Sequence, residues 1–287
     1  MLTATEARRV RRRPTPSLKQ QYQEYVLQRI EGYKNSIPRH ELLRLGDEAV
    51  AEMHSTAEAQ FLLTEVLMLE SVDRLIMKRL ALRSYRRWRQ QFLKLREAQR
   101  QPTHWGLEPE CPLVPLLARV EDEDPTLVVG SEAAAYLLAA HDAAVTFLAS
   151  DMGAVDRVEA GMANESLASF FTAYFVRPGS WLPPIEGPLS LVVVDAGCLT
   201  DSPGAERTSF IHALQGQTAC GGIHVLLPGR GRLAPEALLS CYDGWIRDEV
   251  ARSRRRGSSK RRGVVLTRPA EGDGSLSEPA SHAAGDH

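Results

Sequence analysis

The fold of the second half of this chain follows from one short stretch, Thr126-Leu127-Val128-Val129-Gly130. A continuous apolar run of four residues that ends at a glycine is typical of a parallel strand buried on both faces. Residues 131–142, rich in alanine and leucine, predict a helix directly after it. Strand, tight turn and helix in this order predict an α/β unit.

The same alternation continues as far as Pro269. Further apolar runs predict strands at 144–149, 170–176, 189–194, 223–227 and 263–267. The segments between them predict helices at 153–164, 205–218 and about 234–250. Such alternation is typical of a mostly parallel sheet with helices on both faces, so we expect a Rossmann-like α/β domain over 124–269.

The residues before this domain have a helical pattern. Ser17 with Gln20 predicts a capping box, Ser55 with Glu58 predicts another, and apolar side chains recur at spacings of three and four. We therefore expect an all-α module over 17–100, whose last helix has Tyr85, Trp88 and Phe92 as core residues. The flanking segments are predicted to be a disordered basic arm (1–16), a proline-rich linker (101–123) and a disordered tail (270–287).

Several features of 124–269 together resemble the class I S-adenosylmethionine-dependent methyltransferases. They are the strand-glycine-helix start at 126–138, Asp151 followed by 152–155, Gly187-Pro188 before the strand that ends at Asp195, Gly221-Gly222 before the fifth strand, and the closing strand at 264–267. The resemblance implies methyl transfer from S-adenosylmethionine. It also implies cofactor contacts at Gly130, Ser131, Glu132, Asp151, Met152 and Asp195.

The first loop departs from the family pattern. The family usually has an acidic residue near the end of its first strand and then Gly-x-Gly-x-Gly, whereas this chain has Val128, Gly130, Glu132 and Ala134 at those positions. Asp151 lies where an acidic group can accept hydrogen bonds from ribose hydroxyls, but it could equally be a helix N-cap. For Asp195 we favour the cap of the turn after its strand over a position in the reacting pocket.

The remaining composition excludes several function classes. Histidines 104, 141, 212 and 224 lie in different predicted elements, and the four cysteines have no zinc-ligand or redox spacing, so we expect no metal site. Neither a nucleophile elbow nor a phosphate-binding Gly-x-x-x-x-Gly-Lys loop occurs. No apolar run is long enough to span a bilayer, and the basic N-terminus is unlike a secretory signal, so we expect a cytoplasmic protein.

Charge is segregated along the chain although its net value is only −1. Residues 74–100 contain ten lysines and arginines: Arg74, Lys78, Arg79, Arg83, Arg86, Arg87, Arg89, Lys94, Arg96 and Arg100. A second basic stripe covers 252–262, and residues 8–13 are basic too. Such stripes attract nucleic-acid phosphates, although solvated helix faces and tails are often basic as well.

Two functions are therefore expected from the sequence. The first is an S-adenosylmethionine-dependent methyltransferase whose helical module selects the acceptor. The alternative is a catalytically inactive protein of the same fold that serves as a binding or assembly factor, in which case the basic stripes indicate nucleic acid as the partner.

Overall fold

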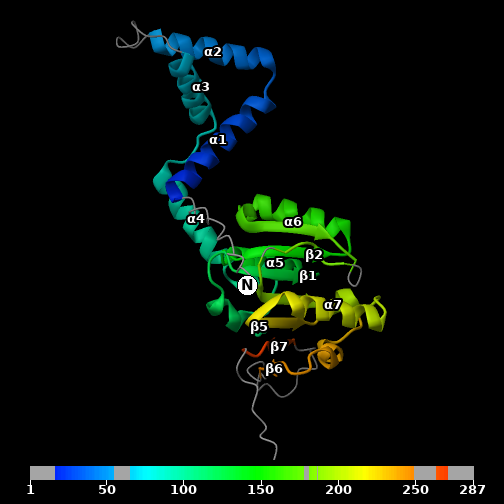
Figure 1. Ribbon diagram of the computed structural model, residues 1–287. Helices are drawn as coiled ribbons and strands as arrows, with labels where there is room; N and C mark the ends of the chain where they lie inside the picture. The colour runs from blue at the N-terminus through cyan, green and yellow to red at the C-terminus, as the bar shows by residue number, and fades with distance from the viewer. Residues whose placement is uncertain (1–16, 55–64, 178–180, 186, 249–262, 271–287) are drawn as a thin grey trace, which may run out of the picture. The chain divides into compact units, whose positions relative to one another are not determined.

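The computed structural model describes residues 17–54, 65–177, 181–185, 187–248 and 263–270. The chain divides into two compact units, Met1–Leu95 and Arg96–His287 (Figure 1). Each unit has a hydrophobic core of its own and is described by itself.

The first unit is helical. It contains α1 (Leu18–Ser36), α2 (Arg39–His54), α3 (Glu65–Arg79) and the larger part of α4 (Tyr85–Gln99). The predicted capping box at Ser17 is confirmed, because its hydroxyl accepts a hydrogen bond from the backbone N–H of Gln20 and the Gln20 side chain accepts one in return. Its core consists of Ile30, Leu45, Ala49, Val72, Leu75 and Ile76. The capping box predicted at Ser55 lies outside the described residues.

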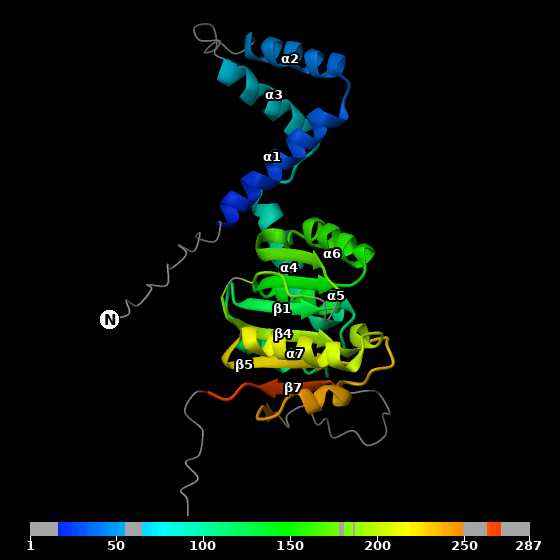
Figure 2. The ribbon, with the colours of Figure 1, turned by 45° about the vertical axis from the view of Figure 1, so that its right-hand side comes forward.

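The second unit is built on a seven-stranded sheet with the order β3-β2-β1-β4-β5-β7-β6. The strands are β1 (Pro125–Val129), β2 (Ala144–Ala149), β3 (Phe171–Phe175), β4 (Leu189–Asp195), β5 (Thr218–Leu227), β6 (Ile246–Arg247) and β7 (Val264–Thr267). The first five are parallel, and β7 runs antiparallel to β5 and β6. Figure 2 shows β1, β4, β5 and β7 side by side. The predicted Rossmann-like, mostly parallel sheet is confirmed.

Side chains alternate along β1 between two separate cores. Val128 packs with residues of α5 (Glu132–Ala140) and α6 (Met152–Asn164) on one face. Leu127 and Val129 pack on the other face, in the core to which α7 (Gly204–Gln217) contributes. Because successive side chains of a strand point to opposite faces, a continuous apolar run is what burial on both faces requires.

Two segments differ from a simple alternation of strand and helix. The predicted helix over about 234–250 is wrong: a 3-10 helix, η6 (Pro235–Cys241), is followed by Gly244 with a φ of 78° and by the short strand β6. A left-handed residue ends a right-handed helix. Residues 101–123 contain the 3-10 helices η2 (Pro102–Trp105) and η3 (Val114–Arg119), and they bury Leu113, Leu116 and Leu117 in the core of the second unit.

A buried polar network joins β5 to the segment before β6. The imidazole of His224 is fully buried, with its Nε2 2.8 Å from the Thr218 hydroxyl and its Nδ1 2.9 Å from the Tyr242 hydroxyl. Thr218 donates its own proton to the carbonyl of Leu214, so it accepts from Nε2–H, and Tyr242 donates to Nδ1. Burial, together with the smaller effect of the nearby Arg268, lowers the pKa of His224 from 6.5 to about 3.

The buried, neutral His224 predicts a specific dependence of stability on pH. Above pH 6.5 the imidazole is neutral in both states, so its contribution to folding is fully present; as the pH falls from 6.5 towards 3, only the unfolded chain takes up the proton, and stability is lost. We expect the free energy of unfolding of the wild type, measured in urea, to fall with decreasing pH in this range. The fall should be steeper than that of a His224→Gln variant by about 1.4 kcal/mol per pH unit. Carboxylate titration is common to both proteins and cancels in the difference. Equal slopes of the free energy of unfolding against pH in the two proteins would contradict a neutral, buried His224.

Candidate functional site at the carboxyl edge of the sheet

The direction of the strand order reverses between β1 and β4, which makes the carboxyl edge near these strands the place where an open α/β sheet binds ligands. The residues predicted from the sequence form two groups there. Gly130 lies against the turn that contains Asp195, and Glu132 and Asp151 share one cation.

Gly130 ends β1 in a conformation that few other residues adopt. Its φ is 78°, and its N–H donates to the carbonyl of Leu148 over 2.9 Å. A Cβ at this position would lie 2.9 Å from the Cβ of Cys198 in η5 (Ala196–Leu199). Glycine is therefore needed twice, for the left-handed turn and for the close approach of two loops.

Cys198, which no sequence pattern indicated, occupies the crevice between β1 and β4. Burial raises the pKa of its thiol to about 12, and the neighbouring Asp195 carboxylate acts in the same direction. The raised pKa favours the protonated thiol over the reactive thiolate at neutral pH. Its role at this edge is to fill space beside Gly130.

Glu132 stands at the start of α5, after the N-cap Ser131, whose hydroxyl accepts from the N–H of Ala134. Its carboxylate is 2.7 Å from the guanidinium of Arg157 on α6, and the same guanidinium is 3.7 Å from the carboxylate of Asp151. The negative charge that Glu132 brings to the cofactor loop is thus paired. Arg157 belongs to no recognisable sequence motif. It is identified as the partner of Glu132 only by the packing of α5 beside α6.

Asp151 ends β2 and caps α6, where its Oδ1 accepts from the N–H of Gly153 over 3.0 Å. The helix-cap interpretation is confirmed, but capping uses only one of the two oxygens. The side chain of Asp151 is 68% exposed, and that of the next residue, Met152, is exposed as well. The second oxygen lies 3.7 Å from the guanidinium of Arg157, so an exposed carboxylate with an apolar neighbour faces solvent at this edge, and its contact with a cofactor stays a prediction.

Asp195 is enclosed by two glycine-containing loops. Its carboxylate accepts from the N–H of Gly197 over 2.7 Å, which confirms the favoured turn cap, and burial raises its pKa. A Cβ on Gly229 would lie 1.6 Å from its Oδ1, and a Cβ on Gly231 would lie 2.4 Å from the carbonyl oxygen of Gly197. The segments after β4 and β5 therefore interlock through residues without side chains. A signal for this existed in the sequence, because Gly229 and Gly231 directly follow the fifth strand.

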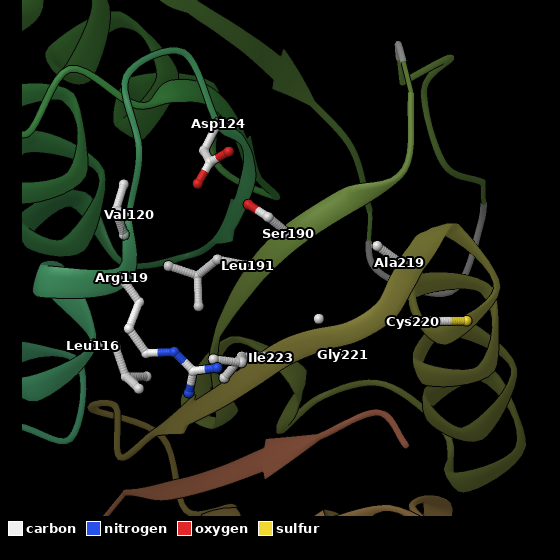
Figure 3. Close-up of a pocket in the computed structure, with 11 residues that line it drawn as sticks. Leu116, Arg119, Val120, Asp124, Ser190, Leu191, Ala219, Cys220, Gly221 and Ile223 are labelled. Atoms are coloured by element: carbon white, nitrogen blue, oxygen red, sulfur yellow. The ribbon is translucent and has the colours of Figure 1, made fainter. Parts of the chain in front are cut away.

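A cavity of about 180 Å³ lies at the opposite, amino edge of the sheet (Figure 3). It forms where the pairing of β4 with β5 shifts register between Leu189 and Leu191, and Arg119 and Asp124 line it from the chain before β1. Because parallel strands present their carboxyl ends on the other side, this cavity is separate from the predicted site.

The described part of the chain holds no group of three or more histidine, cysteine or acidic side chains that could bind a metal ion. Among its helices, none combines the length and apolar character that a membrane span requires.

The contact of Gly229 with Asp195 predicts a mutation with a large steric cost. Gly229→Ala is expected to lower the free energy of unfolding by about 2 kcal/mol, because the new methyl group must displace a half-buried carboxylate. The loss of stability caused by Gly229→Ala should be smaller when Asp195 is also replaced by alanine. Thermal denaturation of the single and double variants measures this difference. Gly216→Ala is the matched control: it lies in α7 with nothing within 4 Å of its Cβ, and it should be neutral or stabilising. A Gly229→Ala protein as stable as the wild type would contradict the interlock.

No model of a known protein family matches the chain, and neither does any curated protein sequence. Several solved methyltransferases are similar in structure. An rRNA methylase from Streptococcus thermophilus is 10% identical over 55% of this chain and 93% of its own, with a TM-score of 0.42. The N-methyltransferase NodS from Bradyrhizobium japonicum is 15% identical over 54% and 93%, with a TM-score of 0.42.

A third solved structure is an S-adenosylmethionine-dependent methyltransferase from Geobacter sulfurreducens in complex with S-adenosyl-L-homocysteine. It is 13% identical over 41% of this chain and 46% of its own, with a TM-score of 0.33. Similarity at this level says nothing about activity. The strand order and the alternation of strand and helix give the second unit a Rossmann-like fold.

Proposed function

We propose that the second unit binds S-adenosylmethionine at the carboxyl edge of its sheet and transfers the methyl group to an acceptor. The observation that carries this proposal is the exposed carboxylate of Asp151 at the end of β2, the strand next to β1 and its left-handed Gly130. An acidic group at this place, about twenty residues after the glycine turn, can accept hydrogen bonds from ribose hydroxyls.

The described residues fit the adenosine end of this cofactor. The oxygen of Asp151 that does not cap α6 would accept a hydrogen bond from the ribose beside its ion pair with Arg157, and the exposed side chain of Met152 would pack against the adenine face. The cofactor itself supplies a methyl group on a positively charged sulfur. Methyl transfer is an in-line displacement, and holding acceptor and methyl donor in line supplies much of the rate.

The methionine end would meet tighter surroundings. Cys198 already lies against Gly130, and Glu132 places a carboxylate at the loop, although Arg157 balances its charge. Because like charges in a partly dry site are costly, we expect the ion pair of Glu132 with Arg157 to be a condition for binding the methionine carboxylate. The backbone of Gly130 and Ser131 would contact the same end.

Calorimetry with S-adenosylhomocysteine, the demethylated product, tests the proposal. Asp151→Asn keeps a good helix cap but removes the carboxylate, so we expect the affinity to fall roughly tenfold or more while α6 stays folded. Asp156→Asn is the matched control, since Asp156 is exposed on the same helix and faces no predicted contact. No heat at millimolar ligand, or equal affinities of the two variants, would overturn the assignment.

A second candidate function is nucleic-acid binding by a protein of this fold that no longer catalyses. Nine of the ten cations predicted as one stripe at 74–100 fall into two sets, and the tenth, Arg74, is exposed on α3. Lys78 and Arg79 form ion pairs with Glu52 and Glu48 on α2, and Arg96 and Arg100 both pair with Asp142 in the second unit. Each of these four cations has an acidic partner, with Arg96 and Arg100 sharing one carboxylate.

The other set of cations supports nucleic-acid binding as the second candidate function. Arg83, Arg86, Arg87, Arg89 and Lys94 are exposed, and none forms an ion pair with another residue that the structure describes. Unbalanced cations concentrated along one helix attract phosphates because binding releases condensed counterions. The second predicted stripe, 252–262, lies outside the described residues.

Salt dependence distinguishes this candidate from adventitious attraction. We expect the full chain to bind a fluorescein-labelled oligonucleotide more weakly as salt rises, as measured by anisotropy. The double variant Arg86→Gln/Arg89→Gln should make the slope of log K against log salt shallower by about 1.5, since each lost phosphate contact removes about 0.7 to 0.9. Lys78→Gln/Arg79→Gln removes the same charge from paired residues and should change the slope less. An unchanged slope in both variants contradicts the candidate.

A further inference from the structure

A cluster of five aromatic rings joins α1 to α4 within the first unit. Its members are Tyr22, Tyr25, Tyr85, Trp88 and Phe92, and neighbouring ring centroids are 4.8 to 6.4 Å apart. The prediction that α4 contributes core aromatics is confirmed for Trp88, which is buried, and is wrong for Tyr85, which is 38% exposed. Tyr22, Tyr25 and Phe92 are half-buried.

The cluster is distinct from the aliphatic core of the same unit. That core is formed by residues such as Ile30, Leu45 and Ile76, and it includes none of the five rings among its buried members. Tyr22 has a structural role, because its hydroxyl donates to the carbonyl of Arg83 over 2.9 Å. Tyr85 contacts Tyr22 of α1 edge to face, with ring centroids 5.4 Å apart, but it is 38% exposed and makes no hydrogen bond with the described residues, so part of its ring is open to a ligand.

Cations border the aromatic cluster on both helices. Arg89 follows Tyr85 by four residues and Arg29 follows Tyr25 by four, a spacing that places side chains on the same face of a helix. Lys19 precedes Tyr22 by three residues. All three cations are exposed and form no ion pair within the described residues. The acidic Glu24 is two positions from Tyr22 and therefore points about 200° away around α1.

We propose that this surface, the five rings with Lys19, Arg29 and Arg89, binds single-stranded nucleic acid. A base stacks on the exposed ring of Tyr85, and the arginines contact the neighbouring phosphates. The inference rests on the nucleic-acid candidate above and specifies the state of the strand. In a duplex the bases are stacked on one another, so an exposed tyrosine ring between cations favours the single strand, whose base faces are free.

Stacking of a base on Tyr85 and attraction of phosphates by cations affect binding in different ways. Stacking requires a single strand and does not change the salt dependence, whereas phosphate contacts do. Anisotropy of the full chain is measured with a labelled oligouridine, an oligothymidine of equal length and a duplex of the same length. We expect both single strands to bind more tightly than the duplex. Tyr85→Leu should weaken single-strand binding about tenfold, leaving the salt slope and the duplex affinity unchanged, because stacking releases no counterions.

Tyr85→Phe is the matched control, since it retains the ring and should bind like the wild type; both variants are checked for an unchanged helical circular-dichroism signal. Equal affinity for single strand and duplex, or a Tyr85→Leu protein that binds like the wild type, would overturn the inference and leave the charge-based candidate in place. Binding of neither strand form at low salt would overturn both. A preference between oligouridine and oligothymidine identifies whether RNA or DNA is bound and supports the proposal in either case.

Discussion

The close contact between the turn after β1 and the segment after β4 constrains the whole carboxyl edge of the sheet. Gly130 takes a left-handed conformation there and lies against Cys198, while Asp195 is held between the backbones of Gly197 and Gly229. A side chain at either Gly130 or Gly229 would separate these loops. The parallel strands bring their ends together, and the absence of Cβ atoms decides how closely the loops that follow can pack.

This packing divides the edge into two regions of different character. Near β1 and β4 the loops pack closely around the thiol of Cys198 and the carboxylate of Asp195, and burial raises the pKa of both groups. Near β2 the edge is open, with the exposed Asp151 and Met152. Arg157 pairs with the carboxylates of both Glu132 and Asp151, so it is the cation that offsets part of the negative charge at this edge.

Positive charge is paired along only part of α4. At the end of the helix, Arg96 and Arg100 share one acidic partner, Asp142, so their charge is partly balanced there. Earlier on the same helix, Arg86 and Arg89 have no such partner among the described residues. A helix can therefore look uniformly basic in sequence and still present charge along only part of its length.

The periodicity of the residues was sufficient to predict the α/β fold, the capping box at Ser17 and most of the strands. Continuous apolar runs and helical spacings are local properties of the chain. A strand that is buried on both faces needs consecutive apolar residues, which the sequence shows directly. The helix expected over about 234–250 failed because Gly244 and the aromatic contacts of His224 with Tyr242 and Trp245 override a weak helical pattern. Arg157 beside Glu132, Cys198 beside Gly130, and the balance of charge along α4 could not be read from the sequence, because each depends on residues that are distant in the chain and become neighbours only when the helices and strands pack.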